Sequence, residues 1–180
     1  MRVVVMGTSG SGKSTFARHL SGLTRIPHVE LDAINWQPGW HSLVLNDLDE
    51  FRHRVSVATS GAAWVIDGNY SVAHDLVFGR ATHLIWLDYP RWLTMSRVVR
   101  RSFNRAIGGY ELWPGTGNRE DFRKWLSRDH PICWAWNTYH QRRHDFAALF
   151  ADPALAHIAR HHIRNSREAQ LLIGQLSTET

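Results

Sequence analysis

A glycine-rich octapeptide near the start of the chain has the residue types that bind phosphate. Residues 7–14 read GTSGSGKS and follow the apolar run at 3–6, which predicts a strand running into the loop. Glycines let backbone N–H groups turn toward phosphate oxygens, and the dipole of a helix that begins near Lys13 favours the same negative charge. We expect Lys13 to reach the β- and γ-phosphates and Ser14 to hold Mg²⁺ through its hydroxyl, because magnesium prefers oxygen ligands. The predicted nucleotide-binding residues are Gly7, Gly10, Ser11, Gly12, Lys13, Ser14 and Thr15.

Two segments, ending at Asp67 and Asp88, consist of four apolar residues followed by aspartate. This pattern places a carboxylate at the end of a strand, where it can reach the magnesium ion of a bound nucleotide. We favour Asp67 as the metal-binding residue, because Gly68 and Asn69 after it allow a ligand to approach the backbone closely. Gly68 and Asn69 are therefore predicted to contact the substrate. Asp88 stands shortly before a proline and is predicted to cap the helix that follows.

Asp32 ends another strand-like run and lies just before Trp36 and Trp40, whose aromatic rings are suited to lining a pocket. Its functional role would be to bind or activate a phosphoryl acceptor, or to contact the water shell of the magnesium ion. Its structural role would be to cap the turn that follows. We leave these roles open and take Asp32 and Trp36 as candidate substrate-binding residues.

Three arginines, Arg97, Arg101 and Arg105, recur every four residues and so share one face of a predicted helix. Like charges at this spacing destabilise an isolated helix, so either water and salt screen them or an anion lies against them. Because the chain also carries a phosphate-binding loop, we favour the anion and take Arg97 and Arg101 as candidate catalytic residues. Arg142 and Arg143 could supply a second clamp or be solvated, and Arg142 is the third catalytic candidate.

Strands and helices alternate along the chain, and this order predicts how the candidate residues are positioned. Five strands separated by helices favour an α/β fold with a five-stranded parallel sheet, helices on both faces and ligands at the carboxyl ends of the strands. The glycine- and tryptophan-rich stretch after the arginine helix predicts a lid at 107–128. The predicted strands are 3–6, 28–31, 62–66, 82–87 and 157–164, and the predicted helices are 13–21, 45–58, 90–106, 129–150 and 166–176.

Length and composition limit the class of protein. A chain of 180 residues with 43% hydrophobic residues fits one domain, 1–180, with at most a lid. No apolar run is long enough to cross a membrane and no signal-peptide pattern precedes the first strand, so we expect a cytoplasmic protein. A single cysteine excludes an intrachain disulfide and a site of several thiolates. The net charge of +5 is carried by scattered arginines without a reader motif, which argues against nucleic-acid binding.

Several motifs together resemble the bacterial adenylate-kinase-like proteins called DNA topology modulation proteins. The motifs are residues 7–15, HVELD at 28–32 with Trp36 and Pro38-Gly39-Trp40, WVIDGNY at 64–70, and LDYP at 87–90 followed by spaced arginines. The resemblance implies a P-loop fold of the nucleoside-monophosphate-kinase type with strand order 2-3-1-4-5, ATP as the nucleotide and a mobile lid after the fourth strand. It also implies that Asp32 acts on the acceptor. Adenylate kinases follow their Asp-Gly pair with Pro-Arg, whereas this chain has Tyr70-Ser71, which argues against a mononucleotide acceptor.

These features favour a kinase that transfers the γ-phosphoryl group of Mg-ATP to a small-molecule acceptor. Phosphoryl transfer depends on positioning and charge neutralisation, which a P-loop, Mg²⁺ and an arginine-bearing lid could supply. The alternative is a nucleotide-gated regulator that acts on a protein or DNA partner with weak or no kinase activity. The sequence argues against a GTPase switch, because it has no Asn-Lys-x-Asp motif and 118–121 resembles that motif only superficially.

Overall fold

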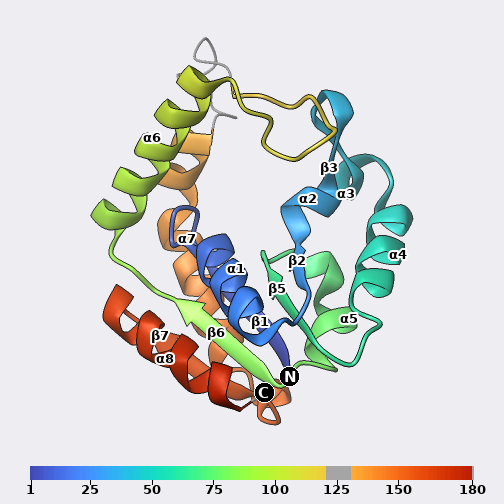
Figure 1. The fold of residues 1–180 in the computed structure, drawn as a ribbon, viewed down its shortest axis with the longest axis vertical. Coiled ribbons are helices and arrows are strands. Elements are labelled where there is room, and N and C mark those ends of the chain that lie inside the picture. The colour runs from blue at the N-terminus through green and yellow to red at the C-terminus, as the bar shows by residue number, and fades with distance from the viewer. Residues whose placement is uncertain (121–130, 180) are drawn as a thin grey trace.

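A central parallel sheet of five strands organises the computed structural model, which describes residues 1–120 and 131–179. Each strand runs parallel to its neighbours, and the order across the sheet is β2-β5-β1-β6-β7 (Figure 1). The carboxyl ends of the strands therefore meet at one edge, with Glu30 paired to Asp67 and Gly7 paired to Leu87. The strands are β1 (Arg2–Gly7), β2 (His28–Glu30), β5 (Trp64–Asp67), β6 (His83–Leu87) and β7 (Ala159–Ile163).

The numbers of this strand order differ from the expected 2-3-1-4-5, because the chain inserts two strands that the sequence did not predict. Strands β3 (Trp36–Gln37) and β4 (His41–Ser42) form a separate antiparallel hairpin. Counted along the chain within the large sheet alone, its strands lie in the order second, third, first, fourth, fifth. Each hairpin strand has only two residues, which is too short for the alternation of apolar and polar residues that predicts a strand.

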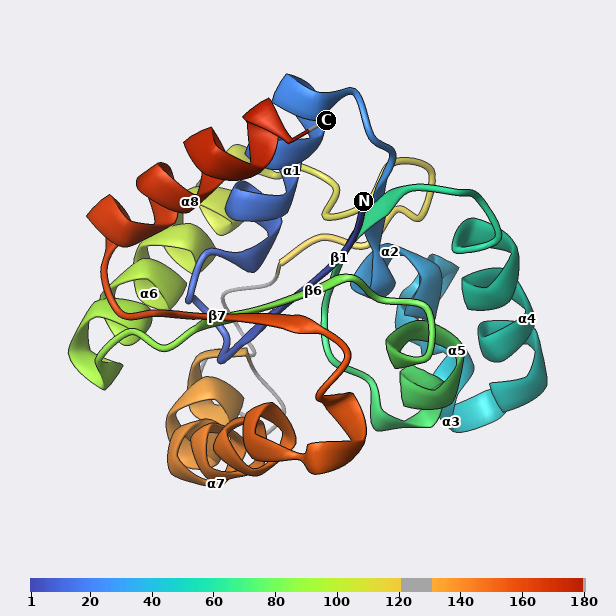
Figure 2. The same cartoon turned by 90° about the horizontal axis from the view of Figure 1, so that it is seen from below.

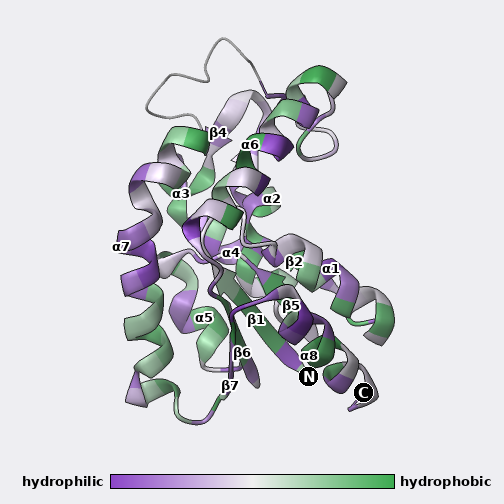
Figure 3. Ribbon diagram, turned by 90° about the vertical axis from the view of Figure 1, so that its left-hand side faces the viewer, coloured by the Kyte–Doolittle hydropathy of each residue, from purple (hydrophilic) through white to green (hydrophobic). Residues whose placement is uncertain are grey.

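Helices cover both faces of the sheet (Figure 2). Helices α1 (Lys13–Thr24) and α8 (Ser166–Thr178) pack on one face, and α4 (Leu48–Ala58), α5 (His74–Phe78) and α7 (Pro131–Ala151) pack on the other. In β1, Val3 and Val5 face the first layer while Val4 and Met6 face the second. The three central strands β1, β5 and β6 are thus buried on both faces, which explains their largely apolar sequences, and β1 and β6 are mostly coloured as hydrophobic in Figure 3.

The helices differ from the predicted ones in two ways: one predicted helix is broken in two, and two short helices were not predicted. The predicted helix at 45–58 is two helices, α3 (Leu43–Asn46) and α4, because Asp47 leaves the helical conformation and its side chain caps α4 at Glu50 N. Helices α2 (Leu31–Asn35) and α5 have five residues each and show no helical periodicity. No helix in the described ranges is long and apolar enough to cross a membrane.

Helix α6 (Arg91–Gly108) carries the arginines, begins directly after Pro90 and is followed by Gly109 in the left-handed conformation. The predicted lid at 107–128 therefore starts inside α6, and its residues 121–128 lie outside the described part of the chain. The loop at 109–120 crosses from α6 to the β3–β4 hairpin (Figure 1). There the buried Asn118 donates to Gln37 O and accepts from Trp40 N, both at 2.9 Å. This loop is docked on the hairpin, and its movement as a lid stays a prediction.

Asp88 joins α7 to the carboxyl end of β6. Arg143 donates to its two carboxylate oxygens at 2.6 and 2.9 Å, and His162 Nε2 lies 3.0 Å from Oδ2. The predicted cap is wrong, because α6 has Pro90 at its N-cap and no side-chain cap. For Arg143, the sequence leaves open both a clamp on a bound anion and a solvated position, and its guanidinium is instead engaged by Asp88. Burial acts to raise the pKa of Asp88, but hydrogen bonds from Arg143 and His162 outweigh it and lower that pKa.

We expect Asp88→Asn to lower the free energy of unfolding by about 2 kcal/mol near neutral pH, because a buried acceptor then loses its charge-assisted bonds. The pKa of Asp88 is lower in the folded state, so its stabilisation is present above the unfolded-state pKa and is lost as pH falls through the folded value. The difference between wild type and variant should therefore shrink below about pH 4. Urea unfolding at several pH values measures it. The exposed control Asp145→Asn should change stability by less than about 0.5 kcal/mol, and an equal loss would contradict the assignment.

Candidate functional site

The glycine-rich loop lies between β1 and α1, at the edge where the strands end. Gly7, Gly10 and Gly12 have positive φ angles, and Gly12 is the N-cap of α1 without any side-chain cap. The first N–H groups of α1 thus have no partner within the helix and can bind an anion. The hydroxyl groups of Thr8 and Ser11 are buried and have no hydrogen-bond partner within the described residues. The loop therefore offers unpaired donors to a phosphate.

Lys13 folds back across this loop and donates from Nζ to Thr8 O at 3.1 Å. Burial lowers the pKa of Lys13, while the charges of Asp32 and Asp67 act to raise it. The ammonium group therefore lies within electrostatic reach of both carboxylates that the sequence selected. Ser14 follows Lys13 in the first turn of α1 and is half-buried, whereas Thr15 is exposed.

Helix α6 packs directly against the loop through Gly10. A Cβ atom on Gly10 would lie 2.3 Å from Thr94 O, so only glycine permits this approach. The contact brings Arg97 Nη1 to 3.4 Å from Ser11 O and Arg101 Nη2 to 3.5 Å from Ser9 Oγ. Both candidate catalytic arginines of α6 thus lie beside the phosphate-binding loop.

Arg105 lies one turn farther along α6, toward the acidic side of the site. Burial lowers its pKa and the charge of Arg101 lowers it further, whereas Glu120, Glu30 and Asp32 act in the opposite direction. The arginine face predicted from the four-residue spacing is therefore turned toward the site along its length. Arg100, on another face of α6, is exposed.

Three carboxylates gather near Lys13 at the ends of β2 and β5. Asp67 is 3% exposed at the end of β5, and His28 Nε2 lies 3.0 Å from its Oδ1. Glu30 ends the neighbouring strand β2 and accepts from Trp113 Nε1 at 3.3 Å. Burial raises the pKa of Glu30, and the charges of Asp67 and Asp32 raise it further. The carboxylates are thus close enough to oppose one another's ionisation.

Asp32 is held in place by Tyr70, whose hydroxyl donates to Asp32 Oδ1 at 2.6 Å. Gly68 lets the segment after β5 approach Leu31 closely, because a Cβ atom there would lie 2.9 Å from Leu31 Cβ and the backbone has φ +113°. Burial raises the pKa of Tyr70, and the charge of Asp32 raises it further, so the phenol stays protonated as a donor. Asp32 itself is exposed and reachable by a ligand.

Aromatic rings cover one side of the acidic cluster. Trp36 stacks on Trp113 with ring centroids 6.4 Å apart, and Trp40 meets both rings edge-on at 5.7 and 6.1 Å. Trp113 belongs to the loop at 109–120, so the predicted lid segment and the hairpin form one aromatic wall. The prediction that Trp36 lies at the site is compatible with this placement, although its ring is in contact with other indoles.

Arg142 reaches the site from α7. Its guanidinium lies over the rings of Trp134 and Phe146, at 4.9 and 5.4 Å, and its buried Nε has no hydrogen-bond partner in residues 1–120 and 131–179. Burial lowers the pKa of Arg142, while Tyr70 and Asp32 act to raise it. Arg142 therefore faces the acceptor side of the cluster, unlike its neighbour Arg143.

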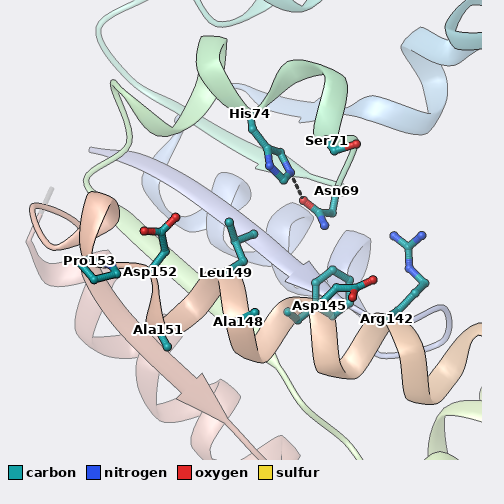
Figure 4. A pocket seen from close by; sticks show the side chains of 11 residues that line it. Asn69, Ser71, His74, Arg142, Asp145, Ala148, Leu149, Ala151, Asp152 and Pro153 are labelled. Atoms are coloured by element: carbon teal, nitrogen blue, oxygen red, sulfur yellow. Dashed lines mark hydrogen bonds between the residues drawn. The ribbon is translucent and has the colours of Figure 1, made fainter.

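The structure brings most of the predicted residues together and adds others. Asn69 is the exception, because its Oδ1 is 2.7 Å from His74 Nε2 and its side chain turns toward a cavity beside the site (Figure 4). Sequence reasoning missed Glu30, Tyr70 and Trp113 as site residues. Glu30 precedes Asp32 by two positions and Tyr70 follows Asn69, so only their closeness to predicted residues could have indicated them.

The hydrogen-bond donors and oxygen ligands of the site fit a nucleoside triphosphate with magnesium. The loop supplies unpaired N–H and hydroxyl donors and a lysine, while Ser14, Asp67 and Asp32 supply oxygen ligands of the kind that Mg²⁺ takes. No group of three or more His, Cys, Asp or Glu residues that could hold a metal by itself occurs in the described ranges. Magnesium does not require one, because it is usually bound by one or two carboxylates together with waters and substrate phosphates.

Comparisons with solved structures place the whole chain in one fold. It is similar to a gluconokinase from Sinorhizobium meliloti 1021, with a TM-score of 0.54 and 16% identity, over 99% of this chain and 94% of that one. A sugar kinase from Janibacter sp. HTCC2649 gives 0.51 and 16%, covering 99% and 90%. A shikimate kinase from Acinetobacter baumannii, solved with shikimate, gives 0.52 and 19%, covering 97% and 89%.

No protein-family model matches the sequence, and no curated protein does. The narrower resemblance to DNA topology modulation proteins therefore stays a prediction. At these identities the structural likeness shows the architecture alone, and the chain shares its α/β fold with these three kinase structures.

Proposed function

We propose that this protein is a Mg-ATP-dependent kinase that phosphorylates a small-molecule acceptor. The observation that carries the proposal is the position of Lys13, which lies in the phosphate-binding loop and within electrostatic reach of both Asp32 and Asp67. The candidate site thus has a phosphate-binding half, formed by the loop, and an acidic half, which contains Asp32 and Asp67, and Lys13 lies between them. A site that only held Mg-ATP would need Asp67 for the metal but would not need Asp32.

The donor half would bind ATP through the loop and α6. The N–H groups at the start of α1 and the side chain of Lys13 would bind the β- and γ-phosphates. Arg97 and Arg101, already beside Ser11 and Ser9, would neutralise charge on the transferring group. Magnesium held near Ser14 and Asp67 would supply further neutralisation of the phosphate oxygens.

The acceptor half would bind a hydroxyl group through Asp32. As the acceptor oxygen bonds to the γ-phosphorus, the bond from that phosphorus to the bridging oxygen breaks and ADP leaves. The hydroxyl proton would pass to Asp32, which Tyr70 holds in one orientation through its 2.6 Å bond. Arg142 would bind an anionic group of the acceptor, and the indoles of Trp36 and Trp113 would restrict access of water.

Removing the Lys13 ammonium tests the donor half. We expect Lys13→Ala to reduce phosphoryl transfer by roughly a hundredfold or more, because the variant loses a fixed positive charge beside the phosphates. The exposed control His19→Ala, on the same helix, should retain wild-type turnover and the same circular dichroism spectrum. The assay incubates protein with Mg-ATP and pooled metabolites and reads masses for the gain of one phosphoryl group. Wild-type turnover in Lys13→Ala would exclude the proposed donor half.

The same assay separates the kinase from the regulator. If wild-type protein yields only ADP and phosphate, or no product, and every pool is unchanged, the regulatory alternative is favoured. That alternative requires a partner whose affinity changes with bound nucleotide.

Tyr70 tests the acceptor half. We expect Tyr70→Phe to lower kcat/KM for the acceptor by about tenfold, because Asp32 loses the bond that orients it, and to leave KM for ATP unchanged. Asp32→Asn should lower kcat by roughly a hundredfold or more, because an amide cannot accept the proton. The matched control Tyr110→Phe removes an exposed hydroxyl and should have no effect. Equal kinetics in Tyr70→Phe and wild type would show that this hydrogen bond has no role in transfer.

A further inference from the structure

A cavity of about 670 Å³ lies beside the proposed site, between α7 and the segment that follows β5. Figure 4 shows Asn69, Ser71 and His74 on one side and residues of α7 on the other. None of the residues that line this cavity belongs to the phosphate-binding loop. It is therefore a separate space that the proposed nucleotide contacts do not use.

The two walls of the cavity differ in chemistry. The α7 side is largely apolar, because Phe146, Ala148 and Leu149 line it. Pro153 closes the far end (Figure 4). The opposite side presents hydroxyl, amide and imidazole groups. Burial lowers the pKa of His74, and its Nε2 is tied to Asn69, so this wall is polar but carries no positive charge near neutral pH. Such walls suit a ligand with an apolar body and polar groups along one edge.

Charge is distributed unequally along the cavity. Arg142 stands at one end and Asp152 at the other, with Asp145 between them (Figure 4). Both carboxylates already accept local hydrogen bonds, Asp145 from Gln141 at 2.8 Å and Asp152 from Ala154 N at 2.9 Å. The buried Nε of Arg142 has no such partner in the described parts of the chain. An anion would therefore be attracted to the Arg142 end and repelled from the Asp152 end.

The volume sets the size of the ligand. Cavities that enclose drug-sized organic molecules measure about 300–1,000 Å³, and this cavity lies in the middle of that range. A simple inorganic anion would leave most of the apolar wall in contact with water. We propose that the cavity is a binding site for an organic anion with an apolar body, whose charged group lies against Arg142 and whose body lies along Ala148 and Leu149. This site shares Arg142 with the acceptor half of the proposed function, whereas binding of the anion itself requires no phosphoryl transfer.

The test uses anilinonaphthalene sulfonate, a fluorescent anion with an apolar body, and needs no knowledge of the natural ligand. We expect the folded wild-type protein to bind the dye saturably. Ala148→Trp fills the cavity and Ala148→Glu places a negative charge in it, so each should weaken binding by about tenfold or more. The matched controls Ala147→Trp and Ala147→Glu change an exposed neighbour that does not line the cavity, and should bind like wild type. Circular dichroism and thermal melting show that each variant is folded.

Three results would overturn the proposal. The first is no binding of the dye to wild-type protein, and the second is equal binding to wild type and to both Ala148 variants. The third is loss of binding in saturating Mg-ATP, which would place the dye at the nucleotide loop. Unchanged dye binding in Lys13→Ala is expected, because Lys13 does not line the cavity. The kinase proposal can therefore fail in the turnover assay while the cavity proposal holds. The cavity proposal can likewise fail in the dye-binding assay while the kinase proposal holds.

Discussion

The close backbone packing of the phosphate-binding loop is the constraint on which the site depends. The loop is enclosed by the end of β6 on one side and by α6 on the other, and Gly10 approaches α6 more closely than any side chain would allow. This contact fixes the rotation of α6 and so decides which of its faces meets the loop. The arginines that recur every four residues lie on that face, and Arg97 and Arg101 therefore reach the loop, whereas Arg100 lies on another face and is exposed.

Charge balance around Lys13 follows from this arrangement. The sheet brings the ends of β2 and β5 together, so Asp67 joins Glu30 and Asp32, which lie two positions apart in the sequence. Burial raises the pKa of Glu30, and the nearby like charges of Asp67 and Asp32 raise it further. Lys13 on one side and Arg142 on the other partly relieve this repulsion between like charges. A ligand that brings phosphate and magnesium would therefore enter a site in which carboxylates and arginines already surround Lys13.

Helix α7 contributes residues both to the candidate site and to the neighbouring cavity. Asp88 fixes the helix to the end of β6 through Arg143, and the next residue back, Arg142, is thereby turned toward Tyr70 and Asp32. The same helix then lines the cavity with Phe146 and Leu149. Two neighbouring arginines thus have different roles, one structural and one at the candidate site. Their order in the sequence gives no hint of this difference, because adjacent residues on a helix point about 100° apart.

The sequence by itself determined the phosphate-binding loop, the alternation of strands and helices, and the arginine face of α6. These are local features: a fixed octapeptide after an apolar run, and a four-residue spacing that a helix turns into one face. It could not predict the β3–β4 hairpin or α5, which are too short to show periodicity, nor assign different roles to Arg142 and Arg143. Tertiary structure alone decided that Tyr70 binds Asp32 across 38 residues and that Trp113 binds Glu30 across 83. Such contacts depend on which strand ends become neighbours in the sheet, and that is fixed by burial of the whole core and not by any local pattern.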